Sequence, residues 1–320
     1  MLKALIAAAS SEHLNLSFSV SRDHAARIVE RPGLWMTDTE LAMLSAELRT
    51  VASKTLAAGD LTYGVFSGER ERFEHSIITV VSNRADKTPV AFNALAVMNI
   101  DLGHTTEDVL HLGLVMVDPN LRSKGLSWVL YGLTCVLILF RNGMRPLWLS
   151  NVTQVPSVVG LVSDGFARVF PVPEPTGQNR CSLMHRLLAR AIMRDHRRVF
   201  GVGDDARFDE ESFVIENAYT GGSDHLKKTF AEAPKHRNEA VNSFCKDRLD
   251  YDRGDDFLQI GQIDTPTALA YIKREVPPRS FTAFALAVIA AIVQRAALPV
   301  WQWADSSRDF GILRARSSKP

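Results

Sequence analysis

Cysteine and excess charge are both scarce in this chain of 320 residues. Its three cysteines, Cys135, Cys181 and Cys245, lie far apart and form no C-x-x-C pair. This pattern argues against a disulfide framework or a zinc site and indicates a reducing compartment. The 37 Lys and Arg residues nearly balance 36 Asp and Glu residues, for a net charge of +1. No nucleic-acid partner is therefore expected, and any anion binding must be local.

A clear secretory signal is also lacking. The first 13 residues contain one lysine and a short apolar patch, so we expect a cytoplasmic protein. The G-x-S-x-G elbow that presents a serine nucleophile is absent, which argues against a covalent enzyme intermediate. A hydrophobic content of 46% nevertheless allows a sizeable core.

The most informative stretch covers residues 111–170. An apolar run over residues 112–117 is followed by a polar turn, an almost uncharged segment over residues 126–140, and another apolar run over residues 147–149. This order predicts strand, loop, helix and strand, as in a βαβ unit. The uncharged segment is too short to span a bilayer, so we expect a helix buried in the core.

The turn before that helix combines cations, hydroxyl groups and a glycine, in Arg122, Ser123, Lys124, Gly125 and Ser127. A helix N-terminus leaves backbone N–H groups unpaired and carries partial positive charge, so a glycine-containing loop there suits a phosphate. Gly125 lets the backbone approach the anion, and Arg122 can contact two phosphate oxygens. Neither G-x-x-x-x-G-K-[ST] nor G-x-G-x-x-G fits this loop, which argues against a P-loop or a dinucleotide fold.

Residues 115–127 read V-x-V-x-P-x-x-R-x-x-G-L-S. This pattern resembles the acyl-coenzyme A-binding motif of the GNAT superfamily of N-acetyltransferases, and Gly165-Phe166 is similar to the Gly-Phe that opens the sixth strand of that fold. The resemblance is strongest over residues 72–172. It implies an α/β (α+β) domain over residues 1–200, with a mixed, mainly antiparallel sheet flanked by helices. Residues 201–320 would form a C-terminal helical extension of unknown role.

The resemblance also implies a reaction. A small-molecule amine would attack the thioester of acetyl-coenzyme A or a longer acyl-coenzyme A directly, without a metal. Backbone near Met116 and Val117 would contact the thioester oxygen. Asn151 has two interpretations, contact with the pantetheine arm or capping of the next helix. The pyrophosphate loop would comprise Arg122, Ser123, Lys124, Gly125, Leu126 and Ser127.

The residues for proton transfer are where the sequence departs from the family. A tyrosine is usual four residues before the Gly-Phe glycine, and Leu161 stands there. Either the thiolate leaves unassisted or through water, another element supplies the acid, or catalysis is absent. His111 is the first candidate base, since an imidazole pKa of about 6.5 suits proton abstraction near neutrality, although a strand histidine is commonly structural. Glu74 and His75 are the next candidates.

Elements on either side of the motif can also be predicted. Two β-rich runs within residues 72–100 predict a hairpin, and residues 109–117 the strand after it. Thr37 and Glu40 have the spacing of a capping box, and leucines at helical spacing follow them. Residues 183–200 predict an amphipathic helix with five arginines. Its basic face could meet an acidic carrier protein such as acyl carrier protein, phospholipid headgroups or the phosphates of coenzyme A, or it could simply be solvated.

The segment from Phe281 to Trp303 is rich in apolar residues and contains Pro299, which is expected to end its helix. Three interpretations remain: a helix docked on the domain, an interfacial anchor giving peripheral membrane contact, and a membrane span. The rivals to a soluble enzyme are a non-catalytic acyl-coenzyme A-binding or regulatory module and a membrane-associated long-chain acyltransferase. A homodimer is left open.

Overall fold

The computed structural model describes residues 12–56, 62–121, 126, 128–175, 177 and 179–305. Ten strands in these ranges form one sheet, in the order β1-β2-β3-β4-β5-β6-β10-β9-β8, and β7 also pairs with β10. The strands are β1 (Asn15–Ser19), β2 (His24–Glu30), β3 (Ser76–Asn83), β4 (Pro89–Asp101), β5 (Thr106–Val117), β6 (Leu147–Thr153), β7 (Ala167–Phe170), β8 (Arg207–Asp209), β9 (Val214–Glu216) and β10 (Asp256–Ile263).

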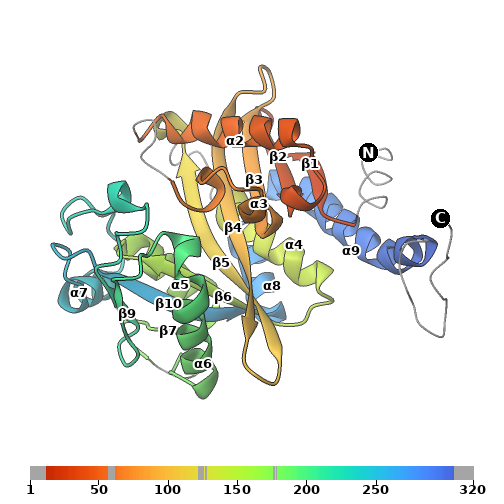
Figure 1. Cartoon of the computed structure of the whole chain (residues 1–320). Coiled ribbons are helices and arrows are strands. Elements are labelled where there is room, and N and C mark those ends of the chain that lie inside the picture. Colours follow the sequence, from red (N-terminus) through yellow and green to blue (C-terminus); the bar gives the residue numbers. More distant parts are fainter. Residues whose placement is uncertain are drawn as a thin grey trace.

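Helices cover both faces of the sheet (Figure 1). The longer ones are α2 (Asp38–Ala52), α4 (Thr134–Arg141), α5 (Pro156–Gly165), α6 (Leu183–Ala191), α7 (Glu239–Arg248), α8 (Thr265–Glu275) and α9 (Phe281–Ala304). The shorter turns are η1 (Pro32–Leu34), η2 (Gly64–Phe66), α3 (Arg70–Glu74), η3 (Pro119–Leu121), η4 (Trp128–Leu133), η5 (Ile192–His196), η6 (Arg197–Phe200), η7 (Asp224–Leu226) and η8 (Pro278–Ser280).

The predicted mixed architecture is confirmed, with a mainly antiparallel sheet, flanking helices and a C-terminal helix. The predicted hairpin is β3 and β4, and the βαβ unit is β5, the helical segment η4–α4, and β6. Only β5 and β6 run parallel; the other pairs are antiparallel. The capping box of Thr37 and Glu40 is present at the start of α2.

Each face of the sheet has its own core. One side packs against α4, α5 and α9 through a cluster that includes Leu133, Leu149 and Val162. On the opposite side, α2 covers β3 to β5, and α6 covers β6 and β10. Side chains that alternate along β5 and β6 therefore reach both layers.

The predicted domain boundary at residue 200 cuts through this sheet. Strand β10 belongs to the C-terminal part of the chain, yet it pairs with β6 along its whole length and with β7 on its other edge. Residues 201–320 therefore contribute a central strand and are not only a helical extension. The reason is physical: without β10, the edges of β6 and β7 would lack backbone hydrogen-bond partners.

Helix α9 docks on the domain, where Phe284, Ala287 and Ala291 are buried against α4 and β1. It continues through Pro299, so the expected end at that residue is wrong. The last turns tolerate the missing N–H because they extend beyond the docked part, with Trp301 exposed. By length and composition the helix of residues 278–304 could cross a membrane, and 28% of its most apolar window is buried inside the protein.

Candidate functional site

The parallel strands β5 and β6 pair over only part of their length. Their register covers Val109 with Trp148, Leu110 with Leu149, and His111 with Ser150. Beyond that point β5 continues to residue 117 and β6 to residue 153, with no pairing between them. Two strand edges thus face each other across a gap that opens toward their C-terminal ends, and such edges carry backbone groups able to bind an extended chain.

Gly113 explains where the gap begins. The register of β4 and β5 shifts between Ala94 and Ala96, which marks a β-bulge opposite this glycine. A Cβ on Gly113 would lie 2.1 Å from the Ala94 carbonyl oxygen, so the bulge accepts only a residue without a side chain. Because a bulge bends its strand, it turns β5 away from β6 just after the last paired residue, His111.

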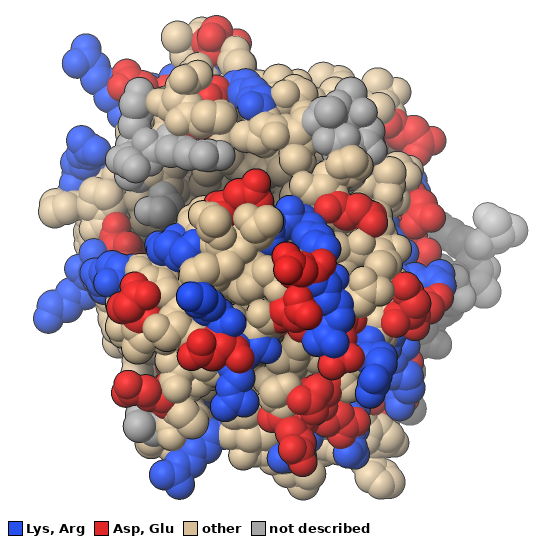
Figure 2. All heavy atoms as spheres, turned by 90° about the vertical axis from the view of Figure 1, so that its left-hand side faces the viewer, with Lys and Arg blue, Asp and Glu red and all other residues tan. Residues whose placement is uncertain are grey.

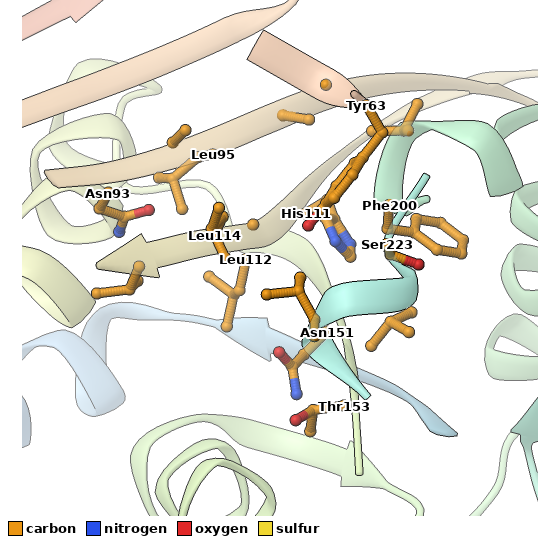
Figure 3. A pocket seen from close by; sticks show the side chains of 18 of the residues that line it. Tyr63, Asn93, Leu95, His111, Leu112, Leu114, Asn151, Thr153, Phe200 and Ser223 are labelled. Carbon is orange, nitrogen blue, oxygen red and sulfur yellow. The ribbon is translucent and has the colours of Figure 1, made fainter. Parts of the chain in front are cut away.

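A cavity of about 1120 Å³ occupies this region and is lined from both faces of the sheet (Figure 3). Leu112 and Leu161 belong to the layer of α4 and α5. Tyr63 and Phe200 lie on the opposite layer. The cavity therefore passes through the sheet at the gap, and a ligand in it can be approached from two sides. Its volume exceeds that of a typical small-molecule site.

The first candidate base, His111, lies in the cavity wall at the closed end of the gap (Figure 3). Its Nδ1 is 3.0 Å from Ser150 Oγ, and its ring centroid lies 4.9 Å from that of Phe200, with the two ring planes tilted by 30°. The side chain is 3% exposed, and this burial lowers the pKa of the imidazole to about 4. His111 is therefore neutral near pH 7 and only weakly basic.

Burial of a neutral His111 predicts a pH-dependent stability. The unfolded chain binds a proton on this imidazole below about pH 6.5, whereas the folded protein does so only below about pH 4. Folding is therefore destabilised as the pH falls through this window, by up to about 3 kcal/mol. We expect His111→Gln to flatten the fall in the free energy of unfolding between pH 6.5 and 4.5, measured by urea denaturation. Parallel profiles for the two proteins would contradict this assignment.

The second candidate base, Glu74, does not line the cavity; its side chain lies against Gly33, outside the walls. Its neighbour His75 does line it. The sequence could not separate the two, because they are adjacent at the end of α3, where the helix gives way to β3.

The predicted cofactor-binding residues are placed as follows. Met116 and Val117 line the cavity near the open end of β5. Asn151 lines it from β6 and donates its Nδ2 to Gln259 Oε1 over 3.2 Å. It does not cap the next helix, because the N-cap of α5 is Val155. Leu126 is buried in the core that packs against α4. The remaining predicted residues lie outside the described ranges: Arg122, Ser123, Lys124, Gly125 and Ser127.

An asparagine that the sequence did not single out also lines the cavity. Asn93 on β4 is buried, and its Nδ2 donates to the Leu130 carbonyl oxygen. Its Oδ1 has no hydrogen-bond partner among the described residues. Because an unsatisfied buried acceptor costs about 1–3 kcal/mol, this oxygen is a candidate to receive an N–H from a ligand.

A second group of missed residues lies on the β10 side of the cavity. Tyr63, Tyr219 and Asp256 come from three distant segments and all line it. The Tyr219 hydroxyl donates to Asp256 Oδ1 over 2.9 Å. Burial, with the charge of the adjacent Asp255, raises the pKa of the Asp256 carboxyl to about 7, although the bond from Tyr219 opposes the shift. A carboxyl group that titrates near neutrality in a cavity is a candidate for proton transfer.

No family model matches this chain, and a comparison with curated proteins also found no match. Within the described ranges, no group of three or more His, Cys, Asp or Glu side chains is placed to hold a metal ion. The geometry of the cavity therefore carries the functional argument.

Proposed function

We propose that this chain is a GNAT-type N-acyltransferase, which moves an acyl group from acyl-coenzyme A to an amine by direct attack. The observation that carries the proposal is the gap between β5 and β6, which opens after His111 and contains the cavity. In the sequence, the motif that resembles a pyrophosphate-binding loop directly follows β5.

The chemistry of the gap suits a pantetheine arm. That arm is an extended chain with two amide groups, so it can pair with free strand edges as a peptide strand would. The edges available are those of β5 after residue 111 and of β6 after residue 150. The free Asn93 Oδ1 could accept one amide N–H. Backbone N–H groups of β5 would then stabilise the negative charge that develops on the thioester oxygen.

Coenzyme A is favoured over an acyl carrier protein as the donor. Three of the arginines on the basic helix form ion pairs within the chain: Arg190 with Glu210, Arg194 with Asp195, and Arg198 with Asp204. Figure 2 has positive and negative side chains interspersed over the face that carries α6 and α7. A mixed face of this kind offers little attraction to an acidic carrier protein.

A second candidate function is binding of acyl-coenzyme A without turnover. Leu161, at the position of the family's usual acid, lines the cavity and cannot donate a proton. Release of free thiol from acetyl-coenzyme A in the presence of amines separates the two functions, since the binding module would retain affinity but release none.

Calorimetric titration tests the shared step. We expect acetyl-coenzyme A or a long-chain acyl-coenzyme A to bind the parent, and affinity to fall at least a hundredfold in Arg122→Ala/Gly125→Glu, which places a negative charge in the phosphate loop. The control is Arg186→Glu, which makes the same change in net charge on exposed α6. Absence of binding to a folded parent, or equal loss in the control, would contradict the proposal.

A further inference from the structure

A buried carboxyl group faces the cavity without a cation to balance it. Asp256 is 4% exposed and lines the cavity beside Tyr219. Among the described residues, none of the ion pairs includes Asp256, whereas its neighbour Asp255 is paired with Arg253 at 2.7 Å. A buried anion without a partner is costly and is seldom kept unless it has a function.

The other groups around Asp256 do not remove this imbalance. Tyr63 and Tyr219 are neutral, because burial first, and then the nearby carboxylate, raise the pKa of both phenols well above the ordinary value. The negative charge of the Asp255 carboxylate disfavours ionisation of Asp256, so it adds to the imbalance. The titratable groups that interact with Asp256 are Tyr63, Tyr219, Tyr251 and Asp255. Lys228 also lines the cavity, but none of the ion pairs among the described residues joins it to Asp256.

We propose that Asp256 receives the acceptor as a protonated amine and takes its proton before attack, with Tyr219 as the positioning residue for its carboxyl group. This inference rests on the proposed acyltransferase function and names the acceptor side of the site. Asp256 starts β10 next to the end of β6, on the side of β6 away from β5, and it lines the cavity that reaches both faces of the sheet. An ammonium group there would supply the missing positive charge.

Protons and electrons balance in the proposed transfer of the acyl group to the amine. The ammonium loses one proton to the Asp256 carboxylate and becomes a neutral amine. The nitrogen lone pair forms the C–N bond to the thioester carbon as the C–S bond breaks. The departing sulfur carries away the electron pair of that bond and takes the second nitrogen proton, giving free thiol and amide. Asp256 returns its proton to solvent, so no oxidant or further reactant is required.

The first test is binding of n-hexylamine, with n-hexanol as the neutral probe, to the parent and Asp256→Asn at pH 8 in the presence of free coenzyme A, which has no acyl group to transfer. The substitution keeps the shape of the side chain and its acceptor for the Tyr219 hydroxyl. We expect the affinity for the amine to fall at least tenfold, with the affinity for the alcohol unchanged. Equal amine affinities, or no amine binding by the parent, would overturn the inference.

The second test follows turnover of acetyl-coenzyme A with n-hexylamine against pH. We expect Asp256→Asn to lower kcat/KM at least a hundredfold. Tyr219→Phe should shift the rising limb of the profile to higher pH, because the hydroxyl lowers the pKa of the carboxyl. A merely structural role of Tyr219 would leave the limb in place, and parent-like turnover by Asp256→Asn would overturn the inference.

Calorimetry with acetyl-coenzyme A alone distinguishes the two proposals. If the parent and both variants bind it equally while amine affinity and the pH profile do not respond, the acyltransferase proposal stands and the role of Asp256 fails. If neither the parent nor either variant binds acetyl-coenzyme A, the acyltransferase proposal itself fails.

Discussion

Gly113→Ala is expected to destabilise the protein by roughly 2–4 kcal/mol and to abolish acyl-coenzyme A binding. The added Cβ would lie 2.1 Å from the Ala94 carbonyl oxygen, too close for any side-chain rotation to relieve. The backbone must shift, and the bulge that turns β5 away from β6 would be lost or displaced. Urea denaturation measures the stability, and calorimetry with acetyl-coenzyme A measures the binding.

Gly165→Ala is the matched control for this substitution. Gly165 ends α5, and a Cβ placed there meets no atom within 4 Å. We expect its stability to stay within about 1 kcal/mol of the parent and its ligand affinity to be unchanged. If the two variants are equally stable, the bulge tolerates a side chain and does not explain the position of the gap.

Asp256→Asn is expected to act in the opposite direction and to stabilise the fold above pH 7. The folded protein holds the Asp256 proton up to about pH 7, whereas the unfolded chain loses it near pH 3.8. The parent therefore loses stability as the pH rises between these values, by about 4 kcal/mol at most. The amide cannot ionise, so the gain over the parent should be largest at pH 8 and disappear near pH 4.

The adjacent aspartate supplies the control. Asp255 accepts two hydrogen bonds from Arg253, each 2.7 Å long, and one from the Asp250 backbone. Asp255→Asn should therefore destabilise the protein at pH 8, because it removes the buried carboxylate that accepts two hydrogen bonds from Arg253 and leaves only the longer ion pair with Glu216. Urea denaturation of both variants at pH 8 and pH 5 measures the difference. A loss of stability in both variants at pH 8 would show that the Asp256 carboxyl group stabilises the folded protein instead of destabilising it.

Much of the central fold could be predicted from the sequence because its signals are local. Alternating apolar residues mark β3 and β4, and an apolar run broken by a polar turn marks β5 and the following helix. Strand β10 was not predicted. Its polar residues Asp256 and Gln259 are buried, with partners on distant elements, so they do not alternate with apolar residues as in a half-buried strand.

The residues of the candidate site likewise fall into those with a local sequence signal and those without one. His111 could be found because it lies on the strand that precedes the motif resembling a phosphate-binding loop. Tyr63 and Tyr219 could not, because only the tertiary structure brings their separate segments to Asp256. Asp255 and Asp256 are adjacent in the sequence, and nothing local shows that the Asp256 carboxyl group lacks the cation that pairs with Asp255.

The insertion of β10 between β6 and β7 also determines the order in which the chain can be assembled. As the nascent chain leaves the ribosome, β6 and β7 emerge long before the strand that separates them. The edges of β6 and β7 that pair with β10 remain unpaired until β10 emerges. Contacts between residues so distant in sequence also form slowly. The cavity, whose lining includes Asp256 at the start of β10, is therefore complete only after β10 has been synthesised.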